Sequence, residues 1–276
     1  MNLYALFRRR LWRGVGPICL KGKHVLVTGA ASGIGAACAR GAFQGGASLT
    51  LADKNGALLS EMAATIPGAS THVLDLCRDE EVGGFTAALK SVDALIHCAG
   101  ILQRPLPPQQ LTMREWDLVN SVDLRATYVL AAAIGTSMSR RGSGAIVLIA
   151  SVAGMRSSPL HSYGPAKAAV IALAESLAAE WGPTGVRVNA VSPGFTQTAA
   201  LQRGIDKEIL NTRAMTDSTA LRRLLAPDEI AAAAIFLASD LSSGITGINL
   251  PVDAGYLCAT PWSAYGGLRD TSRDGP

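Results

Sequence analysis

The chain has 276 residues, 49% of them hydrophobic, which is enough to bury a full core in one domain. Its 25 Lys and Arg are nearly balanced by 21 Asp and Glu, so nucleic-acid binding, which usually needs a concentrated basic face, is not indicated. Five scattered cysteines without a C-x-x-C pair indicate neither a disulfide framework nor a zinc site, and we expect no metal.

The longest uncharged apolar stretches fall short of the roughly 20 residues of a membrane span, so we expect a soluble protein of the cytoplasm. The first residues, MNLYALFRRRLWRG, combine apolar side chains with arginines. We expect residues 1–21 to be a basic extension in solvent, with attachment to a membrane surface or targeting to an organelle as the alternatives.

From residue 24 onward, short apolar runs alternate with longer stretches of helical period. Predicted strands are 24–28, 48–52, 71–75, 93–98, 145–150, 186–191 and 248–252, and predicted helices are 33–45, 56–65, 79–90, 112–140, 164–182 and 227–239. This alternation indicates a parallel sheet covered by helices on both faces. Because no linker or repeat interrupts it, residues 22–258 are predicted to form one doubly wound α/β domain with a seven-stranded parallel sheet, followed by a polar tail at 259–276.

A glycine-rich turn, TGAASGIG, follows the first predicted strand. In such sheets ligands bind beyond the carboxyl ends of the strands. Glycines here permit a tight turn and a close approach to a pyrophosphate, and the next helix offers its free N–H groups to phosphate. A bare loop before a helix is the alternative. The predicted cofactor contacts of this turn are Gly29, Ser32, Gly33, Ile34 and Gly35.

An acidic residue, Asp53, ends the second predicted strand. Its carboxylate can accept hydrogen bonds from the ribose of an adenosine and would repel a 2′-phosphate, which predicts NAD rather than NADP. The neighbouring Lys54 could soften that preference. The alternative is that Asp53 caps the next helix or turn.

Two further strand ends carry candidate cofactor contacts. Asp75 and Leu76 follow the third predicted strand, where they could meet the adenine, although aspartate is also a common turn former. Ala99 and Gly100 follow the fourth and offer a surface of small residues where a flat cofactor could lie close to the backbone.

Tyr163 and Lys167 are four residues apart, so on a helix they address the same volume. Pro165 between them is compatible only with the first helical turn. A phenol with a pKa of about 10 becomes a useful base when a nearby ammonium stabilises its anion. Ser151, at the end of the fifth predicted strand, could donate to the same substrate oxygen. Taken alone, Y-x-x-x-K also occurs on ordinary amphipathic helices.

Taken together, these pieces resemble the short-chain dehydrogenase/reductase family over roughly residues 22–257. The resemblance implies a Rossmann-type fold and hydride transfer between NAD(H) and a secondary alcohol or ketone. It implies that Tyr163 is the proton donor or acceptor, that Lys167 lowers its pKa and binds the nicotinamide ribose, and that Ser151 orients the substrate. The matching segments are TGAASGIG, LADKN, DL at 75–76, AG at 99–100, IASVAG, YGPAK, VRVNAVSPGFTQT and ITGINLPVDAG.

The family resemblance has further implications for cofactor, lid and assembly. Pro193, Gly194, Thr196 and Thr198 match the segment that meets the nicotinamide, although a plain loop after a strand would look the same. Residues 198–221 would form the substrate lid. The long helices near 112–140 and 164–182 commonly pair between subunits in the family, which implies a homotetramer or homodimer.

The sequence departs from the family pattern at two places. Asp123 stands where members usually have a catalytic asparagine, and it could preserve the proton relay or raise the pKa of Tyr163. Asn120, one turn earlier, could partly substitute. His97 and Cys98 replace two asparagines, and we interpret Cys98 as a small buried hydrophobic residue, with a reactive thiol as the alternative.

The sequence is also compatible with two other functions. An NADPH-dependent reductase of 3-oxoacyl thioesters is the alternative within enzymes, and Asp53 argues against it. A nucleotide-binding scaffold with decayed chemistry is the alternative outside them, and the intact serine, tyrosine and lysine argue against that. The sequence does not identify the substrate, for which a medium-sized, mostly apolar alcohol or ketone is the expectation.

Overall fold

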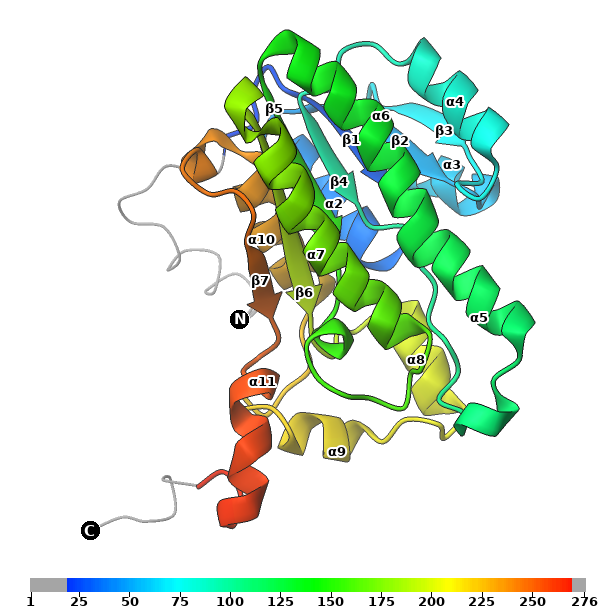
Figure 1. Ribbon diagram of the computed structural model, residues 1–276, viewed down its shortest axis with the longest axis vertical. Coiled ribbons are helices and arrows are strands. Elements are labelled where there is room, and N and C mark those ends of the chain that lie inside the picture. The colour runs from blue at the N-terminus through cyan, green and yellow to red at the C-terminus, as the bar shows by residue number, and fades with distance from the viewer. Residues whose placement is uncertain (1–18, 270–276) are drawn as a thin grey trace.

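The computed structural model describes residues 19–269, so nearly all of the predicted basic extension lies outside the described residues. A single sheet has the strand order β3-β2-β1-β4-β5-β6-β7, and every neighbouring pair is parallel (Figure 1). This confirms the predicted seven-stranded, doubly wound α/β fold. The strands are β1 (His24–Thr28), β2 (Ser48–Asp53), β3 (Ser70–Val73), β4 (Ala94–His97), β5 (Gly144–Ile149), β6 (Val186–Pro193) and β7 (Asn249–Val252).

Helices cover both faces of the sheet, as the unbroken apolarity of the strands requires. Leu26 and Val27, adjacent in β1, are both fully buried but belong to different cores because successive strand side chains point to opposite faces. One core includes α2 (Gly33–Gln44), α3 (Gly56–Ala64) and α10 (Pro227–Ala238). The other includes α4 (Asp79–Ala88), α6 (Ala126–Arg141) and α7 (Tyr163–Trp181).

The strand order changes direction at β1, which pairs with β2 on one side and with β4 on the other. After β1 the chain forms β2 and β3 on one side of that strand, and it then crosses to form β4 on the other side. Such a switch point opens a crevice beyond the carboxyl ends of the strands, which is where ligands bind in open α/β sheets. The predicted site residues follow these strand ends.

The single helix predicted over 112–140 is wrong in one respect. The structure has α5 (Met113–Asn120) and α6 joined by one π-helical turn at Ser121–Arg125. The wider turn carries Asp123, whose side chain is fully buried. Hydrophobic period gave no sign of this turn, because an inserted residue changes the rotation of a helix without interrupting it.

Three short helices lie outside the predicted ones. α8 (Ala199–Asp206) and α9 (Thr212–Asp217) occupy the proposed lid, and α11 (Tyr256–Ala259) begins the C-terminal part. Residues Thr260–Tyr265 form a 3-10 helix, where the sequence suggested only a polar tail. Within residues 19–269, no helix combines the length and apolarity that crossing a membrane would need.

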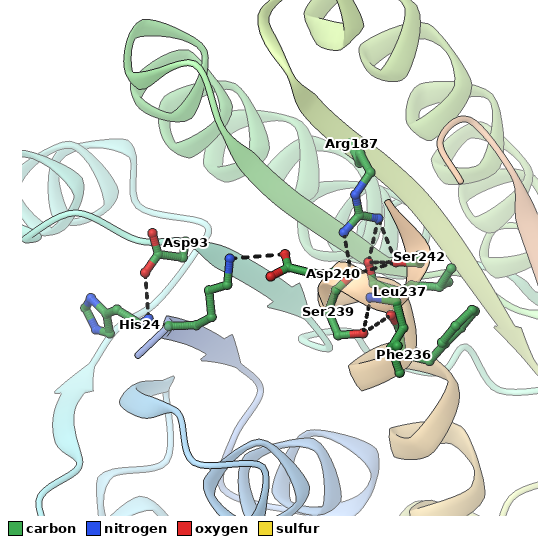
Figure 2. A network of polar contacts seen from close by, with 10 residues as sticks. His24, Asp93, Arg187, Phe236, Leu237, Ser239, Asp240 and Ser242 are labelled. Carbon is green, nitrogen blue, oxygen red and sulfur yellow. Dashed lines mark hydrogen bonds and ion pairs between the residues drawn. The ribbon is translucent and has the colours of Figure 1, made fainter. Parts of the chain in front are cut away.

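A polar network fixes the amino end of the sheet (Figure 2). Arg187 Nη1 donates to Leu237 O and to Ser242 Oγ, both at 2.8 Å, and Arg187 Nη2 donates to Ser239 O at 3.0 Å. The guanidinium thus meets carbonyls at the C-terminal end of α10, where the helix dipole favours a cation. Nearby, the backbone N–H of His24 donates to Asp93 at 2.8 Å.

Candidate active site

The glycine turn after β1 packs against the segment that follows β4. Gly29 has φ +64°, and a Cβ there would lie 2.7 Å from Ala99 N. Gly33 has φ +54°, and a Cβ there would lie 3.3 Å from Thr198 Cγ2. Larger residues would therefore be strained and would fill the space beside the N-terminus of α2. This cradle of backbone and small side chains fits a dinucleotide pyrophosphate.

Asp53 is tied both to the glycine turn and to the residue that caps the next helix. Its two carboxylate oxygens accept hydrogen bonds from Ala31 N at 3.0 Å and from Asn55 N at 2.9 Å. Asn55, not Asp53, caps α3 by accepting from Leu58 N at 3.2 Å. An ionised carboxylate offers about four acceptor positions, so Asp53 retains capacity for a ribose diol.

The predicted adenine contacts line the same cavity as Asp53. This cavity is bordered by Gly29, Asp53, Asp75, Leu76, Ala99, Gly100 and neighbouring residues. Asp75 also acts as a turn former, because its side chain accepts from Cys77 N at 3.0 Å. The turn-forming role of Asp75 is therefore observed, and its contact with an adenine stays a prediction.

The segment after β6 lies on the other side of the cradle. Pro193 ends the strand, and a Cβ on Gly194 would lie 2.8 Å from Asp253 Cα. Thr196 Oγ1 donates to Gly194 O at 3.0 Å, while Thr198 caps α8 by accepting from Leu201 N at 3.2 Å. A cavity of about 440 Å³ lies between this segment and the glycine turn, lined in part by Ser32, Gly33 and Thr198.

α7 begins at Tyr163, as the position of Pro165 predicted. The Lys167 ammonium lies 5.6 Å from the centroid of the Tyr163 ring, on the same side of the helix. It also donates to Ile149 O at the end of β5, at 3.0 Å. Ser151 follows that strand and accepts from Ala153 N at 3.1 Å. The fold thus gathers these three side chains at the carboxyl end of β5.

The departure at Asp123 produces a buried ion pair. Asp123 Oδ1 lies 3.0 Å from Lys167 Nζ, and both side chains are almost completely buried. Ile101 N donates to both carboxylate oxygens at 3.2 Å. A Cβ on Gly100 would overlap the carboxylate and would lie 3.3 Å from Lys167 Nζ. Gly100 therefore gives room to the pair, and its contact with a cofactor stays a prediction.

Burial and charge set the protonation of this group. Burial raises the pKa of Tyr163, and Asp123 raises it further, while Lys167 and Ser151 act in the opposite direction. Burial lowers the pKa of Lys167, but Asp123 and Tyr163 outweigh this and raise it above its usual value. Burial raises the pKa of Asp123, against the attraction of Lys167. The lysine therefore remains a cation at neutral pH.

Asn120 does not take the role suggested for it. Its Nδ2 donates to Trp116 O at 2.9 Å and to Ser162 Oγ at 3.1 Å, so it braces the start of α7 instead of meeting Lys167. It lies in α5, before the π-helical turn that rotates Asp123 toward the lysine. The same turn therefore explains why one side chain reaches Lys167 and the other does not.

His97 ends β4, and Cys98 follows it next to the glycine turn. Burial, reinforced by Lys167, lowers the pKa of His97 to about 3. The neutral ring contacts Thr28 Oγ1 at 2.8 Å and Thr127 Oγ1 at 3.0 Å, which braces β1, β4 and α6. Cys98 is only half-buried, and its Sγ lies 3.9 Å from the buried Cys38 Sγ. It is therefore less enclosed than the sequence suggested.

One residue at the site escaped the sequence reasoning. The side chain of Gln103 is buried, and its Oε1 accepts from Ser162 N at 2.6 Å and from Tyr163 N at 3.3 Å. A lone glutamine in a proline-containing loop has no period or motif that could reveal such a contact.

Known proteins of similar sequence include dehydrogenases and reductases. A family model described as enoyl-(acyl carrier protein) reductase matches residues 29–257. D-threitol dehydrogenase of Mycolicibacterium smegmatis is 37% identical over 246 residues, covering 86% of this chain and 94% of its own length. Dehydrogenase/reductase SDR family member 6 of Danio rerio is 33% identical over 242 residues, covering 86% and 98%.

The chain belongs to the short-chain dehydrogenase/reductase family. It is accordingly an NAD(P)-dependent oxidoreductase that acts on CH–OH groups. A solved structure described as ribose-5-phosphate isomerase from Brucella melitensis is 52% identical, with a TM-score of 0.88, and the match covers 91% of this chain and 98% of that one. The enzyme therefore shares its fold with a protein whose given name is not that of a dehydrogenase.

Proposed function

We propose that this enzyme transfers a hydride between NAD(H) and a secondary alcohol or ketone, with Tyr163 as general acid and base. The observation that carries the proposal is the position of Tyr163 at the first turn of α7, beside a buried lysine. Ala99 and Gly100 link the two halves of the site, because Ala99 touches the glycine turn and Gly100 borders the lysine. A cofactor held in the cradle would thus lie next to the tyrosine.

The bound nicotinamide would supply the acceptor or donor of the hydride. In alcohol oxidation, the Tyr163 phenolate accepts the proton of the substrate hydroxyl while the C–H electron pair leaves as hydride. Ser151 donates to the same oxygen and orients it. Lys167, held by Ile149 O and Asp123, places its positive charge near the phenolate. Pro193, Gly194, Thr196 and Thr198 would hold the nicotinamide end, and α8 and α9 would cover the substrate.

The raised pKa of Tyr163 has a consequence for direction. At neutral pH the residue is mainly a phenol, which can donate a proton to a ketone oxygen. Alcohol oxidation needs the phenolate, and therefore improves as the pH rises. We infer that reduction is favoured near neutrality and oxidation at alkaline pH.

Asp53 supports NAD as the cofactor, because a fixed carboxylate would lie where NADP carries its 2′-phosphate. The name of the Mycolicibacterium relative adds small polyhydroxy alcohols to the apolar substrates expected from the sequence. Leu118 on α5 and Tyr128 on α6 are about half exposed, at 52% and 53%, and favour pairing of two chains along these helices.

A substrate panel tests this proposal. Apolar secondary alcohols, small polyols and their ketones are offered with NAD(H) and NADP(H), and the absorbance of the reduced nicotinamide is followed. Turnover with NADH on ketones supports the proposal, whereas a strong preference for NADPH and 3-oxoacyl thioesters overturns it. Ribose 5-phosphate without nicotinamide provides a separate check of the activity in the name of the Brucella relative.

Replacing Tyr163 by Phe tests the role of the phenol. Turnover is expected to fall by roughly 10²- to 10⁴-fold, because the proton-transfer group is lost. NADH binding, followed by fluorescence, is expected to change less than about 2-fold, since the ring keeps its place beside Lys167. Tyr265→Phe, at a tyrosine that is 87% exposed, is the matched control. Retained turnover in Tyr163→Phe would mean that another residue handles the proton.

A further inference from the structure

A short segment, Ile101–Arg104, crosses the active site between β4 and α5, and we name it the strap. At one end, Ile101 N donates to both oxygens of Asp123. At the other end, Arg104 N donates to Glu115 Oε1 at 3.1 Å, and its Nη2 donates to Glu115 Oε2 at 2.7 Å. The strap is therefore tied to the π-helical turn and to α5.

Gln103 lies at the centre of the strap and ties it to α7. Only 1% of the residue is exposed. Its amide oxygen accepts from Ser162 N at 2.6 Å and from Tyr163 N at 3.3 Å. The first N–H groups of a helix lack partners within the helix and are usually satisfied by a side chain at its N-cap. Here Gln103 provides that capping from a distant part of the chain.

The local N-cap is occupied elsewhere. The side chain of Ser162 makes no capping hydrogen bond to α7. Its hydroxyl donates to Trp116 O at 3.1 Å and accepts from Asn120 Nδ2 at 3.1 Å. Without Gln103, the backbone N–H groups of Ser162 and Tyr163 would lose the acceptor that holds them, and leaving such buried donors unsatisfied is costly.

The strap thus contacts both Tyr163 and the ion pair beside it. It holds Asp123, the counter-ion of Lys167, through Ile101, and it holds the backbone of Tyr163 through Gln103. We propose that Gln103 is a positioning residue that uses its amide oxygen to fix Tyr163 in register with the Lys167–Asp123 pair. The inference rests on the proposed function of Tyr163. A displacement of about 1 Å at such a residue can reduce turnover by as much as 10²-fold.

The two ends of the Gln103 amide are unequal, which makes the inference testable. Within residues 19–269, its Nε2 is buried without a hydrogen-bond partner, while its oxygen has two. A glutamate at this position would keep an acceptor of the same reach and would lose only the unpaired donor group. Its negative charge would also face a helix N-terminus, which is favourable. Methionine has a similar length but removes the acceptor.

The experiment compares Gln103→Met and Gln103→Glu in the full-length enzyme. For Gln103→Met, kcat in ketone reduction is expected to fall about 10- to 100-fold, with NADH binding within about 2-fold of the wild type. Gln103→Glu is expected to keep kcat within about 3-fold. Gln103→Asn, which is too short to reach both N–H groups, is expected to lose kcat as Met does. Gln110→Met, an exposed glutamine in the same loop, is the matched control.

Hydrogen exchange at the amides of Ser162 and Tyr163 gives a readout that does not need turnover. Faster exchange is expected in Gln103→Met and Gln103→Asn, and retained protection in Gln103→Glu. The inference is overturned if Gln103→Met keeps full kcat, if Glu and Met lose kcat equally, or if exchange at these amides is unchanged. Absence of turnover in the wild type would count against the proposed function, and the exchange comparison would still decide whether Gln103 caps α7.

Discussion

The two ends of the sheet each hold a cation, but they hold it differently. At the amino end, the Arg187 guanidinium donates to backbone carbonyls and one hydroxyl, none of which changes its charge (Figure 2). At the carboxyl end, the Lys167 ammonium is paired with Asp123 and lies beside Tyr163, and both of these can titrate. The first cation has fixed partners, and the second has partners that respond to pH.

This difference separates a structural network from a reactive one. Arg187 keeps its charge at any physiological pH, so its hydrogen bonds contribute to stability without tuning any reaction. The Lys167–Asp123 pair has to be removed from water, a cost that its attraction offsets only in part, so stability alone is a weak reason to keep it. We interpret the pair as a device that sets the proton affinity of Tyr163.

The largest effect on stability is expected for Arg187→Met. The carbonyls and the hydroxyl that it contacts at the end of α10 would lose a charged donor, at a cost of about 2–4 kcal/mol in the free energy of unfolding. Urea unfolding measures this loss, and kcat/KM of the folded protein should remain unchanged. Lys23→Met is the control, because Lys23 meets Asp240 at the same end of the sheet through an exposed ion pair at 3.1 Å and should cost less than about 1 kcal/mol.

His97→Asn, at the carboxyl end of β4, should change the pH dependence of stability. The pKa of the folded His97 is about 3, against an ordinary value of 6.5. As the pH falls below 6.5, the unfolded chain binds a proton that the folded chain does not, so the wild type should lose roughly 2 kcal/mol between pH 6.5 and 5.

The Asn variant lacks this proton and should show a flatter profile in that window, when urea unfolding is measured at several pH values. Asparagine can still donate and accept near Thr28 and Thr127. An equally steep profile in the variant would assign the pH dependence to other groups.

Asp123→Asn is expected to change the rate at neutral pH only a few-fold. Burial raises the pKa of Tyr163 and the carboxylate of Asp123 raises it further, so removing that charge should lower it. The profile of kcat/KM for alcohol oxidation should move to lower pH, with a rise of a few-fold at pH 7. Asp79→Asn, which removes an exposed partner of Arg125, should leave the profile in place. A large loss of kcat at every pH would give the carboxylate a role of its own.

Local patterns in the sequence were sufficient for the sheet and for the tyrosine–lysine pair. The continuous apolarity of the strands follows from burial on both faces, and Tyr163 and Lys167 are brought together by one helical turn. The ends of the predicted strands differ from the observed ones by at most two residues. The π-helical turn at Ser121–Arg125 was missed, because apolar side chains continue on both sides of it.

Long-range contacts explain the rest of what the sequence could not predict. Asn120 and Asp123 are one turn apart in sequence, yet only the second reaches Lys167. Asp53 had two plausible partners, and its carboxylate contacts both. It accepts from Ala31 N in the glycine turn, about two dozen residues earlier, and from Asn55 N at the N-cap of α3. The contacts of Asp123 with Lys167 and of Asp53 with Ala31 do not follow from spacing, since each depends on which groups the fold brings near.

By itself, the sequence determined the order of strands and helices, the glycine turn and the side of α7 that carries Tyr163 and Lys167, because each depends on residues within a few turns of one another. Only the tertiary structure decided that Asp123 pairs with Lys167 and that Gln103 caps α7. The Gln103 contact joins residues 59 positions apart. Hydrophobic periodicity shows which side of a segment is buried. The packing of the whole chain decides which atoms that side contacts.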